Sequence, residues 1–517
     1  MTNNQPRLSK SRYVSAIQCP KILWMKKNLP EQFDDSVMNQ VVLDKGNEIG
    51  DLAMKYFGAF DEVEYSQDIS KMVNDTKELM KLGKKVITEA AFIYDGDLCI
   101  VDILRSVPGG YELIEVKGSS GSPGDTVKDV KEVYLYDMSF QAYILTKNEM
   151  DIKSVKLMCL NREYVRQGDL EEDLDIKELF TLTDCTKTVF KMMKEVENNI
   201  QSFKAVITQE EEPVFDIGSR CEKPYKCGYK GWCFKDLPEK DSIFNIGWSM
   251  RMDKKEQAYK DGILSFQDAL TAHADGRLKL NDKQLRQIEF ALNDMEPVIC
   301  KSGINKFLSK VRYPLYFFDF ETFQPAIPPW KNTSPFKQIT FQYSIHIQNE
   351  RGGEVIHKEF LGRDGLDPRR ELAEKLCADI PDDACVVAYN IPFEKTRIKE
   401  LANIFPDLSS HLLNINSNII DLMEPFQKGA YYSRTMGGKF SIKQVLPSLM
   451  PGDSELDYKQ LDERVQHGGD AMDKYPTMHL LPPDEQEALR KALLAYCCLD
   501  TFAMVKILEK LYEFVSK

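Results

Sequence analysis

Residues 315–322 read Leu315-Tyr316-Phe317-Phe318-Asp319-Phe320-Glu321-Thr322, an apolar run that carries two carboxylates near its end. An unbroken run of aromatic and apolar residues is typical of a strand buried inside a sheet. Side chains alternate along a strand, so Asp319 and Glu321 project from the same face. The stretch therefore predicts a buried strand of an α/β domain that presents two acidic groups to one side.

A second acidic motif lies near the end of the sequence, in a helical run that begins at Asp484. Tyr496 and Asp500 are four residues apart in this run, so they share one face of the helix. Phosphodiester hydrolysis with two divalent cations needs several converging carboxylates, because the two ions lie only about 3.5–4 Å apart. Acidic groups delivered by a strand and by a facing helix therefore predict a two-metal site.

These motifs together resemble those of the DEDDy subgroup of the DEDD 3′→5′ exonucleases, which have an RNase H-like fold. Asp319 and Glu321 match the D-x-E motif of that family, and Tyr496 and Asp500 match its Y-x-x-x-D motif. Residues 390–394, Asn-Ile-Pro-Phe-Glu, match its middle motif N-x-x-F-D except that glutamate replaces the aspartate.

The resemblance implies a role for each matching residue. Asp319, Glu321, Glu394 and Asp500 would hold two Mg²⁺ or Mn²⁺ ions, and Tyr496 would orient the attacking water. Glutamate is one methylene longer than aspartate and still binds a hard cation through oxygen. The departure at Glu394 therefore bears on the geometry of the metals and leaves the assignment in place.

The N-terminal half of the chain contains a predicted β-hairpin. Two strand-like runs, residues 98–105 and 111–117, flank a turn rich in proline and glycine. If the turn is centred between Pro108 and Gly109, Asp102 lies opposite Glu115. Cross-strand partners have Cβ atoms about 5 Å apart, so both carboxylates could share one cation. Lys117 shares the face of Glu115 and would offset the repulsion between the two acids.

This hairpin resembles the core of the PD-(D/E)XK nucleases. By that resemblance Asp102 and Glu115 bind Mg²⁺ or Mn²⁺, and Lys117 positions the attacking hydroxide. Asp137 and Gln141, one helical turn apart in residues 134–145, resemble the glutamine motif of RecB-type nucleases.

The match to RecB-type nucleases is incomplete at two points. The tyrosine usual four residues after the glutamine is replaced by Leu145, and residues 46–50 lack the histidine that such proteins often carry on an early helix. Two interpretations therefore remain, a second cutting site and a DNA-binding platform that does not cut. Glu89 is a further candidate for the lining of this site. In the C-terminal half Asp421 either lines the cleft or is a strand-end aspartate.

Four of the twelve cysteines form a pattern of their own. Cys221, Cys227 and Cys233 follow one another with five residues between successive cysteines, and Cys19 lies far upstream. One early and three late cysteines around a RecB-like core resemble the iron–sulfur nucleases, which implies a [4Fe–4S] cluster. Zinc is the alternative, because four thiolates also suit tetrahedral Zn²⁺, although paired zinc ligands usually have two to four residues between them.

The charge of the chain does not by itself indicate a nucleic-acid partner, because the net charge is −13. Phosphates respond to local fields, however, and residues 1–30 contain six basic and no acidic side chains: Arg7, Lys10, Arg12, Lys21, Lys26 and Lys27.

The sequence shows neither an apolar run long enough to span a membrane nor a signal peptide. Retained thiols favour a reducing, cytoplasmic setting. We expect a nucleic-acid partner, with DNA favoured and RNA as the alternative, and no membrane; the sequence indicates no particular protein partner.

The whole sequence resembles a bacterial family in which an iron–sulfur RecB-like module precedes a DEDDy exonuclease-like domain. The expected order is a PD-(D/E)XK nuclease module in residues 1–240, a helical spacer in residues 245–310 and an RNase H-like module in residues 311–517. The fold class is α/β throughout. The expected activity is metal-dependent processing of DNA ends, with RNA exonuclease activity as the alternative.

Overall fold

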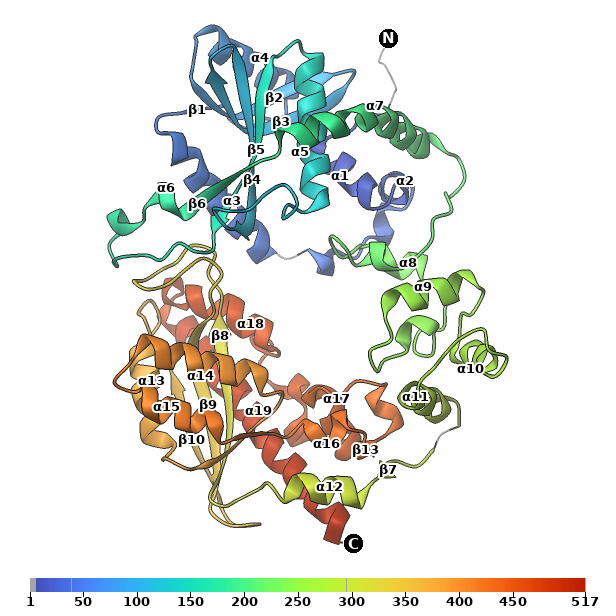
Figure 1. Cartoon of the computed structure of the whole chain (residues 1–517), viewed down its shortest axis with the longest axis vertical. Helices are drawn as coiled ribbons and strands as arrows, with labels where there is room; N and C mark the ends of the chain where they lie inside the picture. The colour runs from blue at the N-terminus through green and yellow to red at the C-terminus, as the bar shows by residue number, and fades with distance from the viewer. Residues whose placement is uncertain (1–5, 39, 294, 517) are drawn as a thin grey trace. The chain divides into compact units, whose positions relative to one another are not determined.

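The computed structural model describes residues 6–38, 40–293 and 295–516, and for residues 40–43 it describes the backbone alone. The chain divides into two compact units, which are described separately. Unit 1 comprises residues 1–236 and 325–337, and unit 2 comprises residues 237–324 and 338–517. Both are mixed α/β structures, which confirms the predicted fold class (Figure 1). No helix in the described part of the chain has the length and apolar character needed to cross a membrane.

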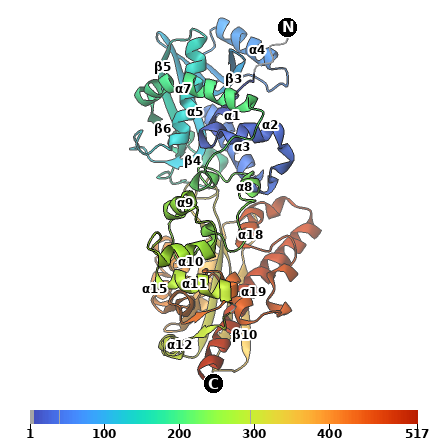
Figure 2. The same cartoon turned by 90° about the vertical axis from the view of Figure 1, so that its right-hand side faces the viewer.

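Two details of the division differ from the expected modules. The helices expected as a separate spacer belong to unit 2, where residues such as Ile243, Phe266 and Ile288 share one apolar cluster. Figure 2 shows these helices in green, labelled α9 to α11. Residues 325–337, expected in the C-terminal module, group with unit 1 because Arg166 bonds to the carbonyl oxygens of Pro328 and Pro329.

Unit 1 is built on a six-stranded sheet in the order β1-β2-β3-β4-β5-β6. The β1·β2 and β4·β5 pairs are parallel and the other pairs are antiparallel. Its strands are β1 (Asp61–Glu62), β2 (Val86–Tyr94), β3 (Asp97–Val107), β4 (Gly110–Gly121), β5 (Ile152–Asn161) and β6 (Phe180–Asp184). Its helices are α1 (Lys10–Gln18), α2 (Lys21–Asn28), α3 (Gln40–Met54), α4 (Ile69–Lys81), α5 (Glu132–Lys147), α6 (Ile176–Leu179), α7 (Thr186–Thr208) and α8 (Lys230–Cys233).

Helices cover both faces of this sheet. Successive residues of β4 point to opposite sides, so Leu113 packs in the cluster that contains α5, and Ile114 packs in the cluster that contains Ile49 of α3. Asp102 and Glu115 project from the same face of the sheet as Leu113, so their side chains are directed toward α5. Helices α1 and α7 in turn pack on α5.

Unit 2 is built on a five-stranded sheet in the order β10-β9-β8-β11-β12, in which β8·β11 and β11·β12 are parallel. Its strands are β8 (Leu315–Phe323), β9 (Ile339–Gln348), β10 (Val355–Leu361), β11 (Cys385–Ala388) and β12 (Ile419–Asp421), with a separate pair β7 (Val298–Ile299) and β13 (Tyr431–Tyr432). Its helices are α9 (Met252–Lys260), α10 (Phe266–Ala274), α11 (Asp282–Asn293), α12 (Lys301–Leu308), α13 (Arg369–Asp379), α14 (Pro392–Ile404), α15 (Ser409–Ser417), α16 (Glu424–Gln427), α17 (Ile442–Leu449), α18 (Gly468–Lys474) and α19 (Pro483–Ser516).

The strand predicted from residues 315–322 is β8, the middle strand of this sheet. Phe317 packs in the cluster that contains residues of α19, whereas Phe318 packs in the cluster that contains residues of α13, α14 and α15. Helix α19 lies against β8 and β9, so one face of β8 is directed toward it (Figure 1). Asp319 and Glu321 lie two and four residues after Phe317 and therefore project from the same face of β8.

Candidate active sites

The acidic residues predicted in the C-terminal half come together in unit 2. Asp319 and Glu321 lie on β8, Asp500 lies on α19, and Glu394 lies in the first turn of α14. Proline at the start of α14 favours the helix there because its fixed backbone angle suits the first turn. Glu321, Glu394 and Asp500 are buried, with exposed fractions of 8%, 4% and 8%, and Asp319 is half-buried.

Crowding and burial shift the pKa values of these acids upward. Burial has the largest effect on the pKa of Asp319, and the charges of Asp500, Glu321 and Glu394 add to it. Together they raise this pKa well above its usual range. The pKa of Glu321 is likewise raised, mainly by burial and next by the charge of Asp500. Burial raises the pKa of Glu394 to about 8 and that of Asp500 to about 6. Carboxyl groups this close repel one another when ionised, and bound cations would remove that repulsion.

Two observations test whether these residues fit metal ions. Oxygens of Asp319 and Glu321 and the Sγ atom of Cys497 lie within 4.8 Å of one another, which is close enough for one ion. Within the described residues, Oε2 of Glu394 is buried and has no hydrogen-bond partner. A buried carboxylate oxygen without a partner is costly unless a cation meets it. The donor set is mainly oxygen, which Mg²⁺ and Mn²⁺ prefer.

The tyrosine of the predicted motif also belongs to this site. Tyr496 is buried on α19, and its hydroxyl interacts with the Asp500 carboxylate, one turn further along the helix. Asp421 is a strand-end aspartate that also lies near this site, since its charge contributes to the raised pKa of Glu394. Its Oδ1 accepts hydrogen bonds from the backbone N–H groups of Asn390 at 3.0 Å and Met423 at 2.9 Å.

Sequence reasoning missed two residues of this site. Tyr458, in a short 3₁₀ turn (Tyr458–Gln460), donates a hydrogen bond to Oδ1 of Asp500. Lys443 of α17 has its Nζ 4.6 Å from the ring centre of Tyr458 and 5.2 Å from that of Tyr496. The positive charge of Lys443 favours the ionised forms of Glu321 and Asp500, so it limits the rise that burial causes in both pKa values. No motif in the sequence indicates either residue, because both come from loops or helices that only the fold brings to the carboxylates.

The hairpin predicted in the N-terminal half is present in unit 1 with the predicted register. Ile103 pairs with Ile114 and Val107 with Gly110, which corresponds to a turn centred between Pro108 and Gly109. One step beyond the paired residues, Oδ2 of Asp102 accepts a hydrogen bond of 2.7 Å from the backbone N–H of Val116.

The other predicted residues of this site form a connected network. Nζ of Lys117 donates to Oε1 of Glu115 at 2.5 Å and to Oδ2 of Asp137 at 2.7 Å. Nε2 of Gln141 donates to Oε2 of Glu115 at 2.6 Å and to Oδ1 of Asp137 at 3.0 Å. The structure thus brings together Asp102, Glu115, Lys117, Asp137 and Gln141, as expected, and it makes Asp137 an acceptor for both Lys117 and Gln141.

Lys10 of α1 was expected only as part of a basic N-terminal arm, but its side chain lies inside this site. Its Nζ is 3.1 Å from Oδ1 of Asp102 and 3.1 and 3.2 Å from the two carboxylate oxygens of Glu115. The ammonium group therefore lies where a cation shared by Asp102 and Glu115 would bind. The two carboxylates suit a divalent ion, which would bind in place of this ammonium group.

The charges of this network are strongly coupled. Burial would lower the pKa of Lys10, but Asp102 and Glu115 outweigh it and hold this pKa well above its usual range. Burial would raise the pKa of Glu115, but Lys10 and Lys117 outweigh it and hold this pKa below its usual range. Burial and the charge of Glu115 raise the pKa of Asp137 to about 6.

Glu89 on β2 lies beside this network, as the sequence suggested. It adopts a positive φ of 55° within the strand, which is a costly conformation for a residue with a side chain. Glu89 and Asp102 line one cavity of about 450 Å³ together with Gly46, Asn47 and Gly50, the stretch that lacks the histidine. Burial and the charge of Asp102 raise the pKa of Glu89 to about 7.

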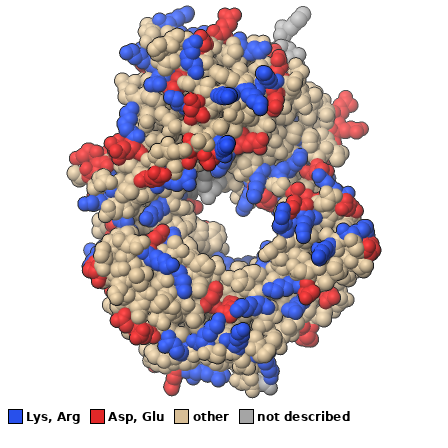
Figure 3. Space-filling view, viewed as in Figure 1, with Lys and Arg blue, Asp and Glu red and all other residues tan. Residues whose placement is uncertain are grey.

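A second cavity, of about 360 Å³, is lined by Lys10. Its lining includes Asp137. It also carries the following basic and aromatic groups: Lys10, Lys26, Lys117, Tyr134, Tyr225 and Lys226. Basic side chains interleaved with aromatic rings are suited to phosphates and stacked bases. Elsewhere charge is mixed, because Lys and Arg lie among Asp and Glu over the face shown in Figure 3.

The four cysteines singled out from the sequence line one small cavity in unit 1. Cys19 follows α1, whereas Cys221, Cys227 and Cys233 lie around α8. Within the described residues, no three of their Sγ atoms lie within 4.8 Å of one another. Tetrahedral zinc would hold thiolates about 3.8 Å apart, given zinc–sulfur bonds of about 2.3 Å. The thiols thus converge, with a spacing wider than a zinc ion requires.

Comparison with known proteins gives similarity but no activity. A family model described as a domain of unknown function (DUF2779) matches residues 316–441, which include Asp319, Glu321 and Glu394. The chain is 21% identical over 446 residues to a protein of Mycoplasma pneumoniae named "Uncharacterized protein MG366 homolog"; the match covers 78% of the chain and 66% of that relative. It is 26% identical over 235 residues to "Uncharacterized protein MG366" of Mycoplasma genitalium, covering 41% of the chain and 34% of that relative. No solved structure matches the chain.

Proposed function

We propose that this chain is a metal-dependent nuclease that removes nucleotides from 3′ ends through the carboxylate site of unit 2. One observation carries the proposal. Four carboxyl groups from β8, α14 and α19 converge, three of them buried and Asp319 half-buried, and an oxygen of Glu394 has no hydrogen-bond partner among the described residues. Such a group of acids is unfavourable in a protein unless it binds cations.

The chemistry of the site follows from its residues. Mg²⁺ or Mn²⁺ bound to Asp319, Glu321, Glu394 and Asp500 would supply the charge stabilisation that phosphodiester hydrolysis needs. Tyr496 would orient the attacking water through its hydroxyl group.

Two residues outside the predicted motifs would support this arrangement. Tyr458 holds Oδ1 of Asp500 by a hydrogen bond, which fixes the direction of that ligand. Lys443, beside both tyrosine rings, would add a positive charge to the site.

For unit 1 we propose that the basic cavity beside Lys10 binds DNA. The cavity combines lysines with the rings of Tyr134 and Tyr225. Whether unit 1 also cuts depends on Lys10, since its ammonium group lies at the cation position of Asp102 and Glu115. A second PD-(D/E)XK site and a DNA-binding platform are the two outcomes that an assay distinguishes.

We further propose that Cys19, Cys221, Cys227 and Cys233 hold a [4Fe–4S] cluster. The spacing of their sulfur atoms, wider than zinc requires, supports the larger group. Cys227 and its neighbours Tyr225 and Lys226 also line the basic cavity. The cluster would therefore hold one wall of the proposed DNA-binding cavity in place.

The proposal is tested with end-labelled single-stranded DNA, double-stranded DNA and RNA in Mg²⁺, Mn²⁺ or EDTA. We expect Asp319→Ala to abolish metal-dependent shortening from the 3′ end and Asp407→Ala, at an exposed ion pair with Arg370, to leave it unchanged. Cutting that survives Asp319→Ala but not Glu115→Ala would assign activity to unit 1. Full 3′ degradation by both Asp319→Ala and Asp500→Ala would overturn the exonuclease assignment. The RNA arm separates the two polymers.

A further inference from the structure

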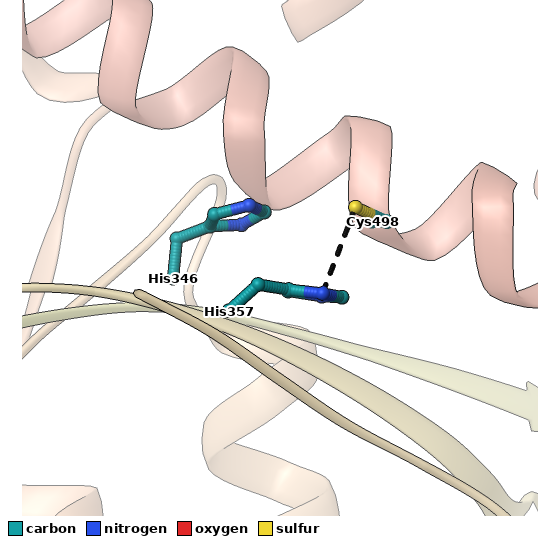
Figure 4. A group of neighbouring side chains, drawn as sticks. All are labelled: His346, His357 and Cys498. Atoms are coloured by element: carbon teal, nitrogen blue, oxygen red, sulfur yellow. Dashed lines mark hydrogen bonds between the residues drawn. The ribbon is translucent and has the colours of Figure 1, made fainter. Parts of the chain in front are cut away.

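Unit 2 contains a second group of metal-ligating side chains, which none of the motifs above includes. One ring nitrogen each of His346 and His357 and the Sγ atom of Cys498 lie within 4.8 Å of one another. Figure 4 shows the two imidazole rings side by side on neighbouring strands, with the thiol of Cys498 directed at them from the helix above.

The sheet register brings the histidines together. His346 of β9 pairs directly with His357 of β10, and their rings stack with centroids 4.5 Å apart. Cys498 lies on α19, which packs against both strands. Nδ1 of His357 is 4.0 Å from Sγ of Cys498, in the direction of the dashed line in Figure 4.

A chain of hydrogen bonds orients both rings. Thr501 donates its hydroxyl proton to the carbonyl oxygen of Cys498 at 3.1 Å. Its oxygen then accepts from Nδ1–H of His346 at 2.8 Å and from the hydroxyl of Ser344 at 2.7 Å. The Ser344 oxygen accepts in turn from Nε2–H of His357 at 2.9 Å.

We assign this direction of donation because it uses each hydroxyl proton once, and the assignment sets both tautomers. It leaves a lone pair on Nε2 of His346 and on Nδ1 of His357, the atom that faces Cys498. Metal-binding histidines almost always donate their other ring N–H to a nearby acceptor, which holds the ring in position. Ser344 and Thr501, exposed by 1% and 0%, are such acceptors.

The surroundings also keep the rings neutral, as metal ligation requires. His346 is buried, and burial together with the neighbouring His357 lowers its pKa to about 4. Burial likewise lowers the pKa of His357. Burial raises the pKa of the Cys498 thiol to about 11, so a bound ion would displace its proton. Two neutral imidazoles and the resulting thiolate suit a borderline-soft ion, whereas Mg²⁺ prefers oxygen ligands.

We propose that His346, His357 and Cys498 bind one Zn²⁺ ion, or a transition metal of the same kind, at a site separate from the carboxylates. Tetrahedral Zn²⁺ bonds to nitrogen at about 2.0–2.1 Å and to sulfur at about 2.3 Å, so its ligand atoms lie about 3.5 Å apart. The observed separations therefore need only a small closure. Three protein ligands leave one position for water or another ligand.

Such an ion would link α19 to the edge of the sheet. Cys498 lies between Tyr496 and Asp500 in the sequence, so binding would fix the part of α19 that carries those two residues. The binding itself depends on none of the nuclease chemistry, and it is measured without a nucleic-acid substrate.

The test uses full-length protein stripped of metal with a chelator and then titrated with Zn²⁺ alone. We expect His357→Asn and Cys498→Ser each to bind one zinc ion per chain fewer than wild type. Matched controls are His411→Asn on α15 and Cys377→Ser on α13, which should bind as wild type does. Any zinc taken up by the four cysteines of unit 1 contributes equally to every variant and cancels in the difference.

Two further readouts apply to the same proteins. Co²⁺ should give thiolate-to-metal absorbance at this site that Cys498→Ser reduces, and Ser344→Ala should weaken zinc binding by about 10–100-fold through the loss of ring orientation. Equal zinc stoichiometry in wild type, His357→Asn and Cys498→Ser would overturn the proposal. That result would leave the exonuclease assignment untouched, because the latter is decided by Asp319→Ala.

Discussion

Nζ of Lys10 lies 3.1 Å from Oε1 of Glu115, although 105 residues separate them in the sequence. The Glu115 side chain is fully buried and the Lys10 side chain is 25% exposed. An ionised carboxylate in such a place is stable only beside positive charge. Lys10 and a divalent cation are therefore alternatives for one position, and the stability of unit 1 reports which of them is present.

The first prediction concerns this exchange. Lys10→Met keeps an apolar side chain of similar length and removes the charge. Without metal we expect the variant to lose about 3 kcal/mol of unfolding free energy, because Asp102 and Glu115 lose a buried partner. Saturating Mn²⁺ should restore most of that loss. Thermal unfolding in EDTA and in Mn²⁺ measures both effects.

Lys71→Met is the control for that experiment. Lys71 pairs with Asp75 on α4, and its side chain is 53% exposed. An exposed pair contributes about 1 kcal/mol or less, and Mn²⁺ should make no difference there. Similar losses in both variants, or no recovery of Lys10→Met in Mn²⁺, would show that Lys10 does not occupy the cation position.

The second prediction concerns the four cysteines. Cys221→Ser should abolish iron binding and lower the unfolding temperature of the chain more than Cys159→Ser does. Cys221 lines the cavity shared by the four thiols, whereas Cys159 is buried in β5 with its Sγ 3.4 Å from the Ser119 hydroxyl. Iron and zinc analysis of anaerobically purified protein provides the measurement. One zinc and no iron in the wild type would favour the zinc alternative.

Local rules predicted several elements of this fold from the sequence. The hairpin of β3 and β4 has the expected register because a short turn with glycine leaves few ways to pair the strands. The run from Leu315 is the strand β8, and the helix expected from Asp484 is α19. Each prediction depended on residues close together in the chain, where alternation and helical spacing determine which side chains share a face.

Contacts between distant segments were beyond such rules. Lys10 and Tyr458 reach carboxylates on other elements, and their neighbours in the sequence contain no motif. The pairing of His346 with His357 depends on the register of β9 and β10, a hairpin that was not predicted from the sequence. The inclusion of residues 325–337 in unit 1 likewise depends on tertiary contacts of Arg166.

The third prediction is a pH dependence of the metal-free protein. Glu394 has a folded pKa of about 8, against about 4.3 in an unfolded chain. The protonated form therefore suits the folded state, so its stabilising effect is complete below about pH 4.3 and is lost as the pH rises to about 8. Asp500, with a folded pKa of about 6, acts in the same direction.

The unfolding temperature in EDTA should accordingly fall between pH 5 and pH 8.5. Each such group contributes a slope of up to about 1.4 kcal/mol per pH unit. Mg²⁺ should remove the fall, and Glu394→Gln should reduce it, whereas Glu371→Gln on the exposed side of α13 should not. An unfolding temperature that rises over this range in EDTA would contradict the burial of these acids as neutral groups.

The last prediction separates the two tyrosines next to Asp500. Tyr496→Phe removes the hydroxyl proposed to orient water and keeps the ring beside Lys443, so the rate at saturating metal should fall by about 10²–10³-fold. Tyr458→Phe removes the hydrogen bond to Oδ1 of Asp500, so it should weaken metal binding by about 10–100-fold. Excess Mg²⁺ should then recover much of the activity of Tyr458→Phe but not that of Tyr496→Phe.

Tyr431→Phe is the control, because the Tyr431 hydroxyl donates to the carbonyl oxygen of Ser448, away from the carboxylates. If Tyr458→Phe shows the metal dependence of Tyr431→Phe, Tyr458 does not position a ligand, and its hydrogen bond to Asp500 only supports the fold.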